Sequence, residues 1–416
     1  MAFREGSLLV KNALIVTPIG KEPIKGEKMG CLKVIPDSYI LIEGGIIRKI
    51  GSMKMVPEMQ KQFKEIDVKG NVVLPGFVDS HTHLVFGGFR PDEFEWRLKG
   101  DSYMSIMERG GGIQSTVNAT KTADAEELFN KSRWFINQMS KMGVTTVEAK
   151  SGYGLDYETE LKILDVIAEL NNDPDSKVEI VSTFLGAHAI PPEFKDRTSE
   201  YVDELIKMLP HLIDKSKFCD VFCEKNVFEL EDSRRLLKAA KALGYELKLH
   251  ADEIVQLGGA ELSAELGAVS ADHLLHVSDE GILKMAERGI VATLLPLTAF
   301  ALREPYAPAR KFIDSGCAVA LATDLNPGSC FSGSIPLTIA LACIYMRMSI
   351  EETITALTLN GAAALKMSDE IGSIEEGKKG DLAILDSDNY KILPYYVGMN
   401  CVKTTIFRGS VVSNNW

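Results

Sequence analysis

Long hydrophobic runs are missing from this sequence. Its most apolar stretch, residues 290–302, is short and interrupted by Pro296, whereas a helix that crosses a bilayer needs about 18 or more consecutive apolar residues. Near the N-terminus, the apolar residues 8–10 are followed at once by Lys11, which leaves too short a core for a signal peptide. We therefore expect neither a membrane span nor a secretory signal.

Cysteine pairs and positive charge are also scarce. The seven cysteines are an odd number, and the only close pair, Cys219 and Cys223, has the wrong spacing for a zinc or redox motif. Such cysteines are typical of reduced thiols in a cytoplasmic protein. The excess of 58 acidic over 46 basic residues gives a net charge of −12, which repels nucleic acids and anionic membranes. We expect a cytoplasmic protein that binds neither.

What the sequence does have is the composition of a globular protein, with 45% hydrophobic and 25% charged residues. A chain of 416 residues is long enough for one large domain and a smaller one. Both ends of the chain alternate apolar and polar residues as β-strands do, over residues 7–18, 38–50, 380–386 and 402–412. We therefore predict that residues 1–68 and 371–416 together form one small β-sandwich domain.

The middle of the chain, residues 69–370, alternates short apolar runs with helical patterns. One helix is predicted to begin at Asp124, which forms a capping pair with Glu127, and to end at Gly143. The apolar runs are nearly continuous, as in a parallel sheet covered on both faces. The candidate strands are Val72–Asp79, Val144–Ala149, Glu179–Phe184, Asp220–Cys223, Glu246–Leu249, Ala268–Ala271, Ile290–Leu295 and Ala318–Thr323. Eight strand–helix units predict an α/β fold of the (β/α)8 TIM-barrel type, and the missing Gly-rich phosphate turn disfavours a doubly wound open sheet.

Histidines gather at the ends of these strands. Five of the seven lie at or just beyond a strand end, where the active sites of such barrels are built. His81 and His83, two positions apart, point to the same face of the first strand. With His250 after the fifth strand and Asp324 after the eighth, they make a set of three nitrogens and one oxygen that suits zinc or iron(II). The remaining coordination position would hold a water molecule whose pKa the metal brings near 7.

Each of these residues also has an ordinary interpretation. A His-x-His pair in a strand is usually polar packing, and an aspartate at a strand end often caps the next turn. His273 after the sixth strand and His188 after the third are compatible with hydrogen-bonded core histidines. Their joint placement at the ends of different strands favours a metal site with His188 and His273 beside it.

Two longer motifs resemble those of a known enzyme superfamily. Residues 73–83 resemble the first-strand signature of the amidohydrolase superfamily, and residues 371–383 resemble its return into the small β domain. Shorter motifs are similar to those of the branch that hydrolyses 4-imidazolone-5-propionate: residues 83–90, 148–154, 250–253, 270–274 and 324–329. This resemblance covers nearly the whole chain. It implies the opening of a cyclic amide to give N-formimidoyl-L-glutamate, a step of histidine degradation.

The resemblance also implies one metal ion per subunit and a homodimer. Many superfamily members bridge two metals with a carboxylated lysine, and Lys150 ends the second strand here. The branch that this chain resembles uses no such bridge, so we expect Lys150 to pair with a neighbouring carboxylate. One departure from the pattern is Phe89, since a smaller and more polar residue is expected before Arg90.

The mechanism that the resemblance implies is an attack of metal-bound water on the ring carbonyl. His273 and Asp324 are both placed to accept the proton of that water. Glu253 is placed to bind the ring nitrogen and to protonate it as the amide bond breaks; alternatively, it is a carboxylate at a helix N-terminus. His188 is placed to polarise the carbonyl oxygen.

The propionate of such a substrate requires a cation in a protein that is acidic overall. Arg90, on the loop after the first strand, offers a bidentate fork for a carboxylate, although an isolated arginine more often belongs to a surface ion pair. Tyr153 adds a hydroxyl donor. On the loop after the eighth strand, Asn326, Gly328 and Ser329 are expected to donate to the substrate from side chain or backbone.

Three other functions compete with this one. Another amidohydrolase, such as a nucleobase aminohydrolase or a different cyclic amidase, would make Arg90 and Tyr153 incidental. A non-catalytic scaffold would usually have lost metal ligands, and this chain retains all the candidates. A purely structural zinc site would be closed and commonly rich in cysteine, yet no cysteine lies beside the histidines.

Overall fold

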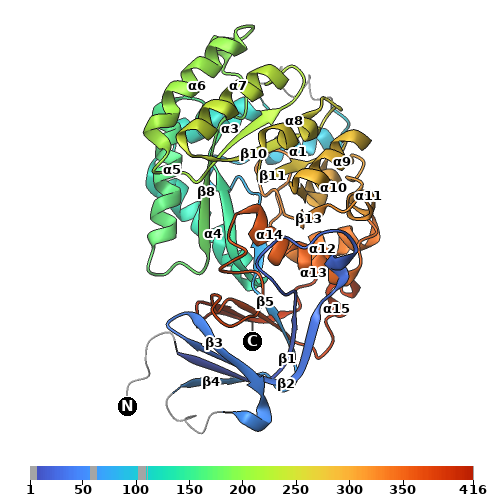
Figure 1. The fold of residues 1–416 in the computed structure, drawn as a ribbon. Coiled ribbons are helices and arrows are strands. Elements are labelled where there is room, and N and C mark those ends of the chain that lie inside the picture. The colour runs from blue at the N-terminus through green and yellow to red at the C-terminus, as the bar shows by residue number, and fades with distance from the viewer. Residues whose placement is uncertain (1–6, 57–62, 102–108, 110, 416) are drawn as a thin grey trace.

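Two eight-stranded sheets organise the chain. The computed structural model describes residues 7–56, 63–101, 109 and 111–415. One sheet is mixed and is formed by both ends of the chain, and the other is parallel and is formed by the middle. In Figure 1 the blue N-terminal strands and the red C-terminal strands lie side by side, below the barrel that the middle forms. The predicted barrel with a small β domain is therefore confirmed.

The mixed sheet joins the two ends of the chain at one antiparallel strand pair, residues 72–75 with residues 382–385. Its order is β16-β15-β14-β5-β1-β2-β3, and β4 pairs with β1. The predicted strand at residues 402–412 is wrong, because the chain turns at Gly409, where φ is +75°, and forms a hairpin. The strands are β1 (Leu8–Thr17), β2 (Lys33–Glu43), β3 (Ile46–Ser52), β4 (Lys64–Asp67), β5 (Val72–Pro75), β14 (Leu382–Leu385), β15 (Val402–Phe407) and β16 (Ser410–Asn414).

The parallel sheet contains eight strands in chain order, from β6 to β13. They are β6 (Phe77–Asp79), β7 (Val144–Lys150), β8 (Glu179–Ala187), β9 (Phe218–Cys223), β10 (Glu246–Ala251), β11 (Ser270–His273), β12 (Val291–Leu294) and β13 (Ala318–Leu321). Seven of the predicted strands match these with shifted ends.

The first predicted strand, residues 72–79, is two strands that belong to different sheets. The chain leaves the mixed sheet at Gly76, whose N–H donates to the carbonyl of Asp381 at 2.9 Å. A Cβ on Gly76 would lie 2.1 Å from Oγ1 of Thr145, so only glycine lets the chain pass here. Because the apolar run of residues 72–79 is continuous across both strands, the sequence alone did not indicate the change of sheet.

Helices cover the outside of the barrel. The helix predicted after Asp124 is confirmed, since the Asp124 side chain accepts from the N–H of Glu127 at 2.8 Å and caps α4. The helices are α1 (Pro91–Leu98), α3 (Ile113–Thr122), α4 (Ala125–Lys141), α5 (Tyr157–Asn172), α6 (Thr198–Leu212), α7 (Leu230–Leu243), α8 (Gly259–Leu266), α9 (Asp279–Arg288), α10 (Pro296–Leu302), α11 (Ala309–Asp314), α12 (Ile335–Ile344), α13 (Ile350–Ala356), α14 (Leu359–Ala364) and α15 (Ile392–Tyr395). Short 3-10 turns lie at Gly26–Gly30, Met53–Met55 and Pro192–Phe194.

Two expectations from composition can be compared with this fold. Among the residues that the structure places, no helix is both long and apolar enough to span a bilayer. All seven cysteines are free thiols, and Cys219, Cys223, Cys317 and Cys330 are buried.

The barrel closes through side-chain and loop contacts between its first and last strands. Asp79, at the end of β6, accepts from the N–H of Thr323 at 2.9 Å and from its hydroxyl at 2.6 Å. One step further, the N–H of Asp324 donates to the carbonyl of His81 at 3.0 Å. Both aspartates and both partners are buried. The seam between the two strands therefore lies directly below two candidate metal ligands.

Replacing Asp79 with alanine should weaken this seam. The change leaves two buried donors of Thr323 without an acceptor, and such a loss costs about 2 to 3 kcal/mol. We expect a lower thermal unfolding midpoint in calorimetry of the metal-free protein. Asp79→Asn retains an acceptor oxygen and should lower the midpoint less. Equal midpoints for wild type and Asp79→Ala would contradict a structural role of the seam.

Candidate metal centre

Three histidines converge above the carboxyl ends of β6 and β10. His81 and His83 follow β6, and His250 lies near the end of β10. The Nε2 atoms of His83 and His250 are 3.4 Å apart, and the rings of His81 and His250 have centroids 4.6 Å apart. All three are buried. Three buried imidazoles at this separation are an arrangement typical of a metal site.

Asp324 adds a carboxylate oxygen to this cluster. Its Oδ1 atom lies 3.6 Å from Nε2 of His81 and 3.5 Å from Nε2 of His83. The hydroxyl of Thr298, on α10, donates to the other oxygen at 2.6 Å and leaves Oδ1 free. Asp324 also has a left-handed backbone with φ of +55°, which is uncommon for a residue other than glycine and often marks a functional site.

The donor set fits a divalent metal ion. Nε2 of His81 and Oδ1 of Asp324 are buried without a hydrogen-bond partner, although buried polar atoms are normally paired. Burial, with smaller contributions from nearby charges, lowers the pKa of His81 and of His83 well below the usual range. Both are therefore neutral imidazoles, the form that binds metals. The structure brings together all four predicted ligands.

Two buried carboxylates lie against the outer nitrogens of His81 and His250, and the sequence analysis did not assign them. Nδ1 of His81 lies 2.6 Å from Oδ2 of Asp272, and Nδ1 of His250 lies 3.0 Å from Oδ2 of Asp220. A carboxylate on Nδ1 places the proton there and leaves the Nε2 lone pair for the metal. Asp272 precedes His273, and Asp220 lies within β9. The one sequence signal for each was its position in a barrel strand, where alternate side chains point into the barrel.

Lys150 lies below these carboxylates, at the end of β7. Its Nζ atom is 2.9 Å from Oε1 of Glu148 and 2.7 Å from Oδ2 of Asp220, as expected for a lysine that pairs with neighbouring carboxylates. Burial alone would lower the pKa of Lys150, but Asp220, Glu148 and Asp272 together raise it. Lys150 is therefore a charged ammonium group.

Two of the predicted proton-transfer residues lie beside the histidine cluster. Nδ1 of His273 is 3.5 Å from Oε1 of Glu253, and the His273 ring is 5.1 Å from that of His250 between centroids. Neither ring nitrogen of His273 has a hydrogen-bond partner. Burial, and then the charges of Asp324 and Glu224, raise the pKa of Glu253 to about 8. Glu253 is thus a carboxylic acid at neutral pH and can donate a proton.

His188 and Tyr153 form one wall of the site. The ring of His188 stacks on that of His83, with centroids 4.7 Å apart and an angle of 14°. Its Nδ1 atom lies 3.0 Å from the carbonyl of Gly152, which assigns the proton to Nδ1. The ring of Tyr153 is 5.2 Å from that of His188.

A third buried carboxylate that the sequence analysis missed shapes this wall. Glu160, on α5, accepts from the N–H groups of Gly152 at 3.0 Å, Gly154 at 2.7 Å and Leu155 at 3.0 Å. These bonds fold the loop after β7 that carries Tyr153. A glutamate in a helix pattern carries no sequence signal for such a role.

Arg90 lies against the loop that follows β13. Its Nη1 atom is 3.4 Å from Oε2 of Glu93, and its buried Nε atom has no partner. A Cβ on Gly328 would lie 1.9 Å from Nη2 of Arg90. Gly328 therefore makes room for the guanidinium, a role that differs from the donor predicted for it.

The polar groups of that loop bond mainly to one another. Oδ1 of Asn326 accepts from the N–H groups of Gly328 at 2.8 Å and Ser329 at 2.7 Å. Its Nδ2 atom donates to the carbonyl of Asp324 at 2.8 Å and to the Ser329 hydroxyl at 2.9 Å. These contacts build the loop, and the role of Asn326, Gly328 and Ser329 as substrate donors stays a prediction.

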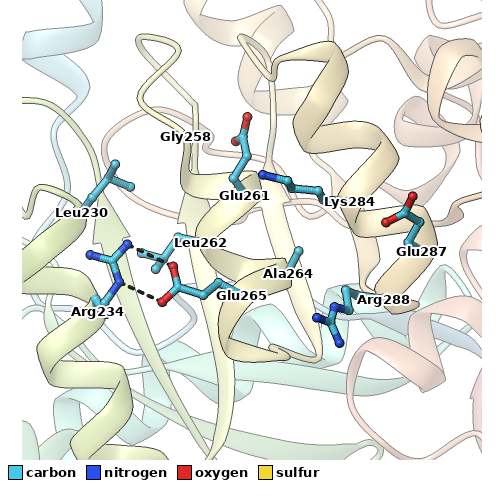
Figure 2. Close-up of a pocket in the computed structure, with 10 residues that line it drawn as sticks. All are labelled: Leu230, Arg234, Gly258, Glu261, Leu262, Ala264, Glu265, Lys284, Glu287 and Arg288. Carbon is cyan, nitrogen blue, oxygen red and sulfur yellow. Dashed lines mark hydrogen bonds and ion pairs between the residues drawn. The ribbon is translucent and has the colours of Figure 1, made fainter.

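A separate groove of about 530 Å³ lies on the outer helices. Figure 2 shows its lining residues, among them Arg234 of α7, which pairs with Glu265 of α8. None of the predicted site residues lines this groove.

Comparison with known proteins gives one family. The chain matches the amidohydrolase family over residues 72–412. It is 62% identical over 412 residues to the imidazolonepropionase of Phocaeicola vulgatus, and 98% of this chain and 99% of that protein are aligned. It is 54% identical over 416 residues to the imidazolonepropionase of Clostridium tetani, with 99% of each chain aligned.

Solved structures share the fold at low identity. A 5-methylcytosine deaminase from Klebsiella pneumoniae, liganded with 5-fluorocytosine, has a TM-score of 0.74 at 16% identity, with 98% of each chain covered. An adenosine deaminase from Xanthomonas campestris with bound zinc has a TM-score of 0.71 at 19% identity, with 97% of this chain and 92% of that one covered. At these identities the similarity shows the fold alone.

Removal of single ligands should deplete the metal. We expect His81→Ala and Asp324→Asn to lose more affinity than the roughly 10- to 100-fold that loss of an outer hydrogen-bond partner costs. Metal analysis of the purified proteins by mass spectrometry measures this. His211→Ala, on the exposed side of α6, is the matched control and should retain its metal. Full occupancy in either ligand variant would refute the ligand set.

Proposed function

This chain belongs to the amidohydrolase family, among its imidazolonepropionases, and from that premise we propose that it hydrolyses 4-imidazolone-5-propionate to N-formimidoyl-L-glutamate in histidine degradation. The observation that carries this proposal is a partly unpaired arginine whose charge acts on Tyr153 and His188. These two residues form the wall of a buried three-histidine, one-aspartate cluster. The first group suits a carboxylate and the second suits a metal that assists hydrolysis.

We propose zinc or iron as the metal, with one ion per subunit held by His81, His83, His250 and Asp324. When bound, such an ion lowers the pKa of a coordinated water towards 7 and so supplies the nucleophile. A single ion is supported by Lys150, because its charged ammonium lies among the carboxylates below the site. Because the charge of Lys150 already balances those carboxylates, they need no second metal ion to do so.

The proton transfers are assigned to three residues. A ring nitrogen of His273, or the carboxylate of Asp324, accepts the proton of the nucleophile, and neither ring nitrogen of His273 has a hydrogen-bond partner. Glu253 holds a proton on its carboxyl group and transfers it to the ring nitrogen as the amide bond breaks. Its raised pKa supports this acid role.

Substrate binding is assigned to the wall and rim of the site. Arg90 binds the propionate, and Tyr153 contributes its hydroxyl group. His188 carries its proton on Nδ1, so its Nε2 is an acceptor in this state. It needs a second proton before it can polarise the carbonyl oxygen.

The principal rivals remain a nucleobase aminohydrolase and another cyclic amidase. Ultraviolet assays with imidazolonepropionate, guanine, cytosine and a hydantoin separate them, and the proposal requires turnover of the first compound above the others. We further propose that the protein acts in the cytoplasm as a homodimer on a small acidic substrate.

Arg90→Ala should impair the use of the acidic substrate selectively. Loss of a charge-assisted pair to a carboxylate costs about 3 kcal/mol, or roughly 100-fold in kcat/KM. Steady-state kinetics with imidazolonepropionate measures this. An imidazolone that carries an uncharged alkyl group in place of the propionate should be hydrolysed equally by wild type and variant.

The matched control for this test is Arg133→Ala, since Arg133 is exposed and pairs with Asp173 at 3.6 Å on the outer helices. It should leave both rates unchanged. Unchanged kcat/KM of Arg90→Ala on the acidic substrate would reject the carboxylate contact.

Glu253→Gln should remove the general acid and, with it, the fall of kcat at alkaline pH. General acid catalysis contributes roughly 100- to 10,000-fold, so kcat should fall within that range while KM changes little. Because the pKa of Glu253 is raised to about 8, its proton is lost as the pH rises through 8, and wild-type kcat should fall there. A variant that keeps this alkaline fall would contradict the assignment.

A further inference from the structure

A cluster of five charged side chains fills the barrel below the histidines. Lys150, Lys248, Glu148, Asp220 and Asp272 are all fully buried. Within it, Lys150 Nζ lies 2.7 Å from Oδ2 of Asp220, 2.9 Å from Oε1 of Glu148 and 3.7 Å from Oδ2 of Asp272. One ammonium group therefore touches or faces every carboxylate of the cluster.

The oxygen atoms that face Lys150 are the same ones that hold the histidines. Oδ2 of Asp220 lies 3.0 Å from Nδ1 of His250, and Oδ2 of Asp272 lies 2.6 Å from Nδ1 of His81. The remaining oxygens of these aspartates are fixed by the N–H of Val221 at 2.7 Å and by the hydroxyl of Ser270 at 2.7 Å. Neither carboxylate can rotate without breaking a bond at each end.

We propose that Lys150 is a positioning residue that holds Asp220 against Nδ1 of His250 and thereby orients Nε2 of that histidine towards the metal ion. This inference rests on the proposed metal-dependent hydrolysis. Two carboxylates in one apolar interior repel each other, and an ammonium between them removes that repulsion. With Asp220 fixed, His250 keeps the tautomer that presents Nε2 to the site.

Lys248 provides an internal comparison because it lies in the same cluster with different contacts. Its Nζ atom donates to the carbonyl of Ser80 at 3.0 Å. The nearest carboxylate oxygens, on Glu148 and Asp272, are 3.5 Å and 3.6 Å away. It makes no close contact with Asp220. Both lysines are buried cations at nearly equal distances from Asp272, but only Lys150 bonds Asp220, the aspartate that lies against His250.

The test compares Lys150→Met with Lys248→Met. Zinc affinity of the metal-free proteins is measured by competition with a chromophoric chelator, and the fold is checked by thermal unfolding. We expect Lys150→Met to bind zinc roughly 10- to 100-fold more weakly, as for loss of an outer partner of a ligand. Lys248→Met should differ from wild type by less than threefold. Equal losses in the two variants, or wild-type affinity in Lys150→Met, would overturn the proposal.

A second variant keeps the test decisive if Lys150→Met does not fold. Asp220→Asn preserves the shape of the side chain and removes its charge, and it should also weaken zinc binding about tenfold or more. If Lys150 acts through Asp220, adding Lys150→Met to Asp220→Asn should weaken binding by less than it does in the wild type. Wild-type zinc affinity in Asp220→Asn would refute the positioning role.

This experiment is independent of the substrate. Zinc affinity is read without imidazolonepropionate, so a protein that binds zinc as expected but does not open the imidazolone ring would refute the proposed function alone.

Discussion

The seam between the first and last barrel strands is the constraint on which the site depends. His81 and His83 follow β6, and Asp324 follows β13, so these three ligands meet only where the barrel closes. Asp79 bonds Thr323 across the seam, and the N–H of Asp324 bonds the carbonyl of His81. The same contacts that close the sheet therefore set the spacing between the aspartate and the histidines. His250, from the opposite part of the barrel, completes the set through the ordinary geometry of a closed parallel sheet.

Much of this could be predicted from the sequence because parallel strands end on one face. Once the apolar runs were assigned to a barrel, His81, His250 and Asp324 had to lie near one another. The change of sheet at Gly76 could not be predicted, because a buried strand has the same pattern in either sheet. Asp220 and Asp272 were missed for a related reason: a polar residue inside a barrel strand has no sequence signature for the partner that it holds. The loop at Asn326 shows a further limit, since its donors are satisfied within the loop.

Charge is arranged in layers along the barrel axis. Buried ammonium and carboxylate groups lie at the bottom, neutral imidazoles lie above them, and Arg90 lies at the rim. Burial keeps His81 and His83 uncharged, so they remain ligands and do not repel a cation. The aspartates of the ion pairs below lie against Nδ1 of His81 and Nδ1 of His250. In a protein with a net charge of −12, Arg90 thus offers a local cation for an anionic substrate.

In this layered arrangement, the residues proposed for the reaction and those proposed for binding the substrate lie in different parts of the site. The deaminases that share the fold do so at 16% and 19% identity, so a barrel with this topology does not by itself select a ring. The residues that we propose for substrate binding lie mainly on the loops after β6, β7, β8 and β13. Gly328 carries no side chain where Arg90 lies, and Glu160 folds the loop that presents Tyr153. Because these two supports come from different elements, the position of Arg90 and the wall of the site can vary independently above an unchanged metal centre.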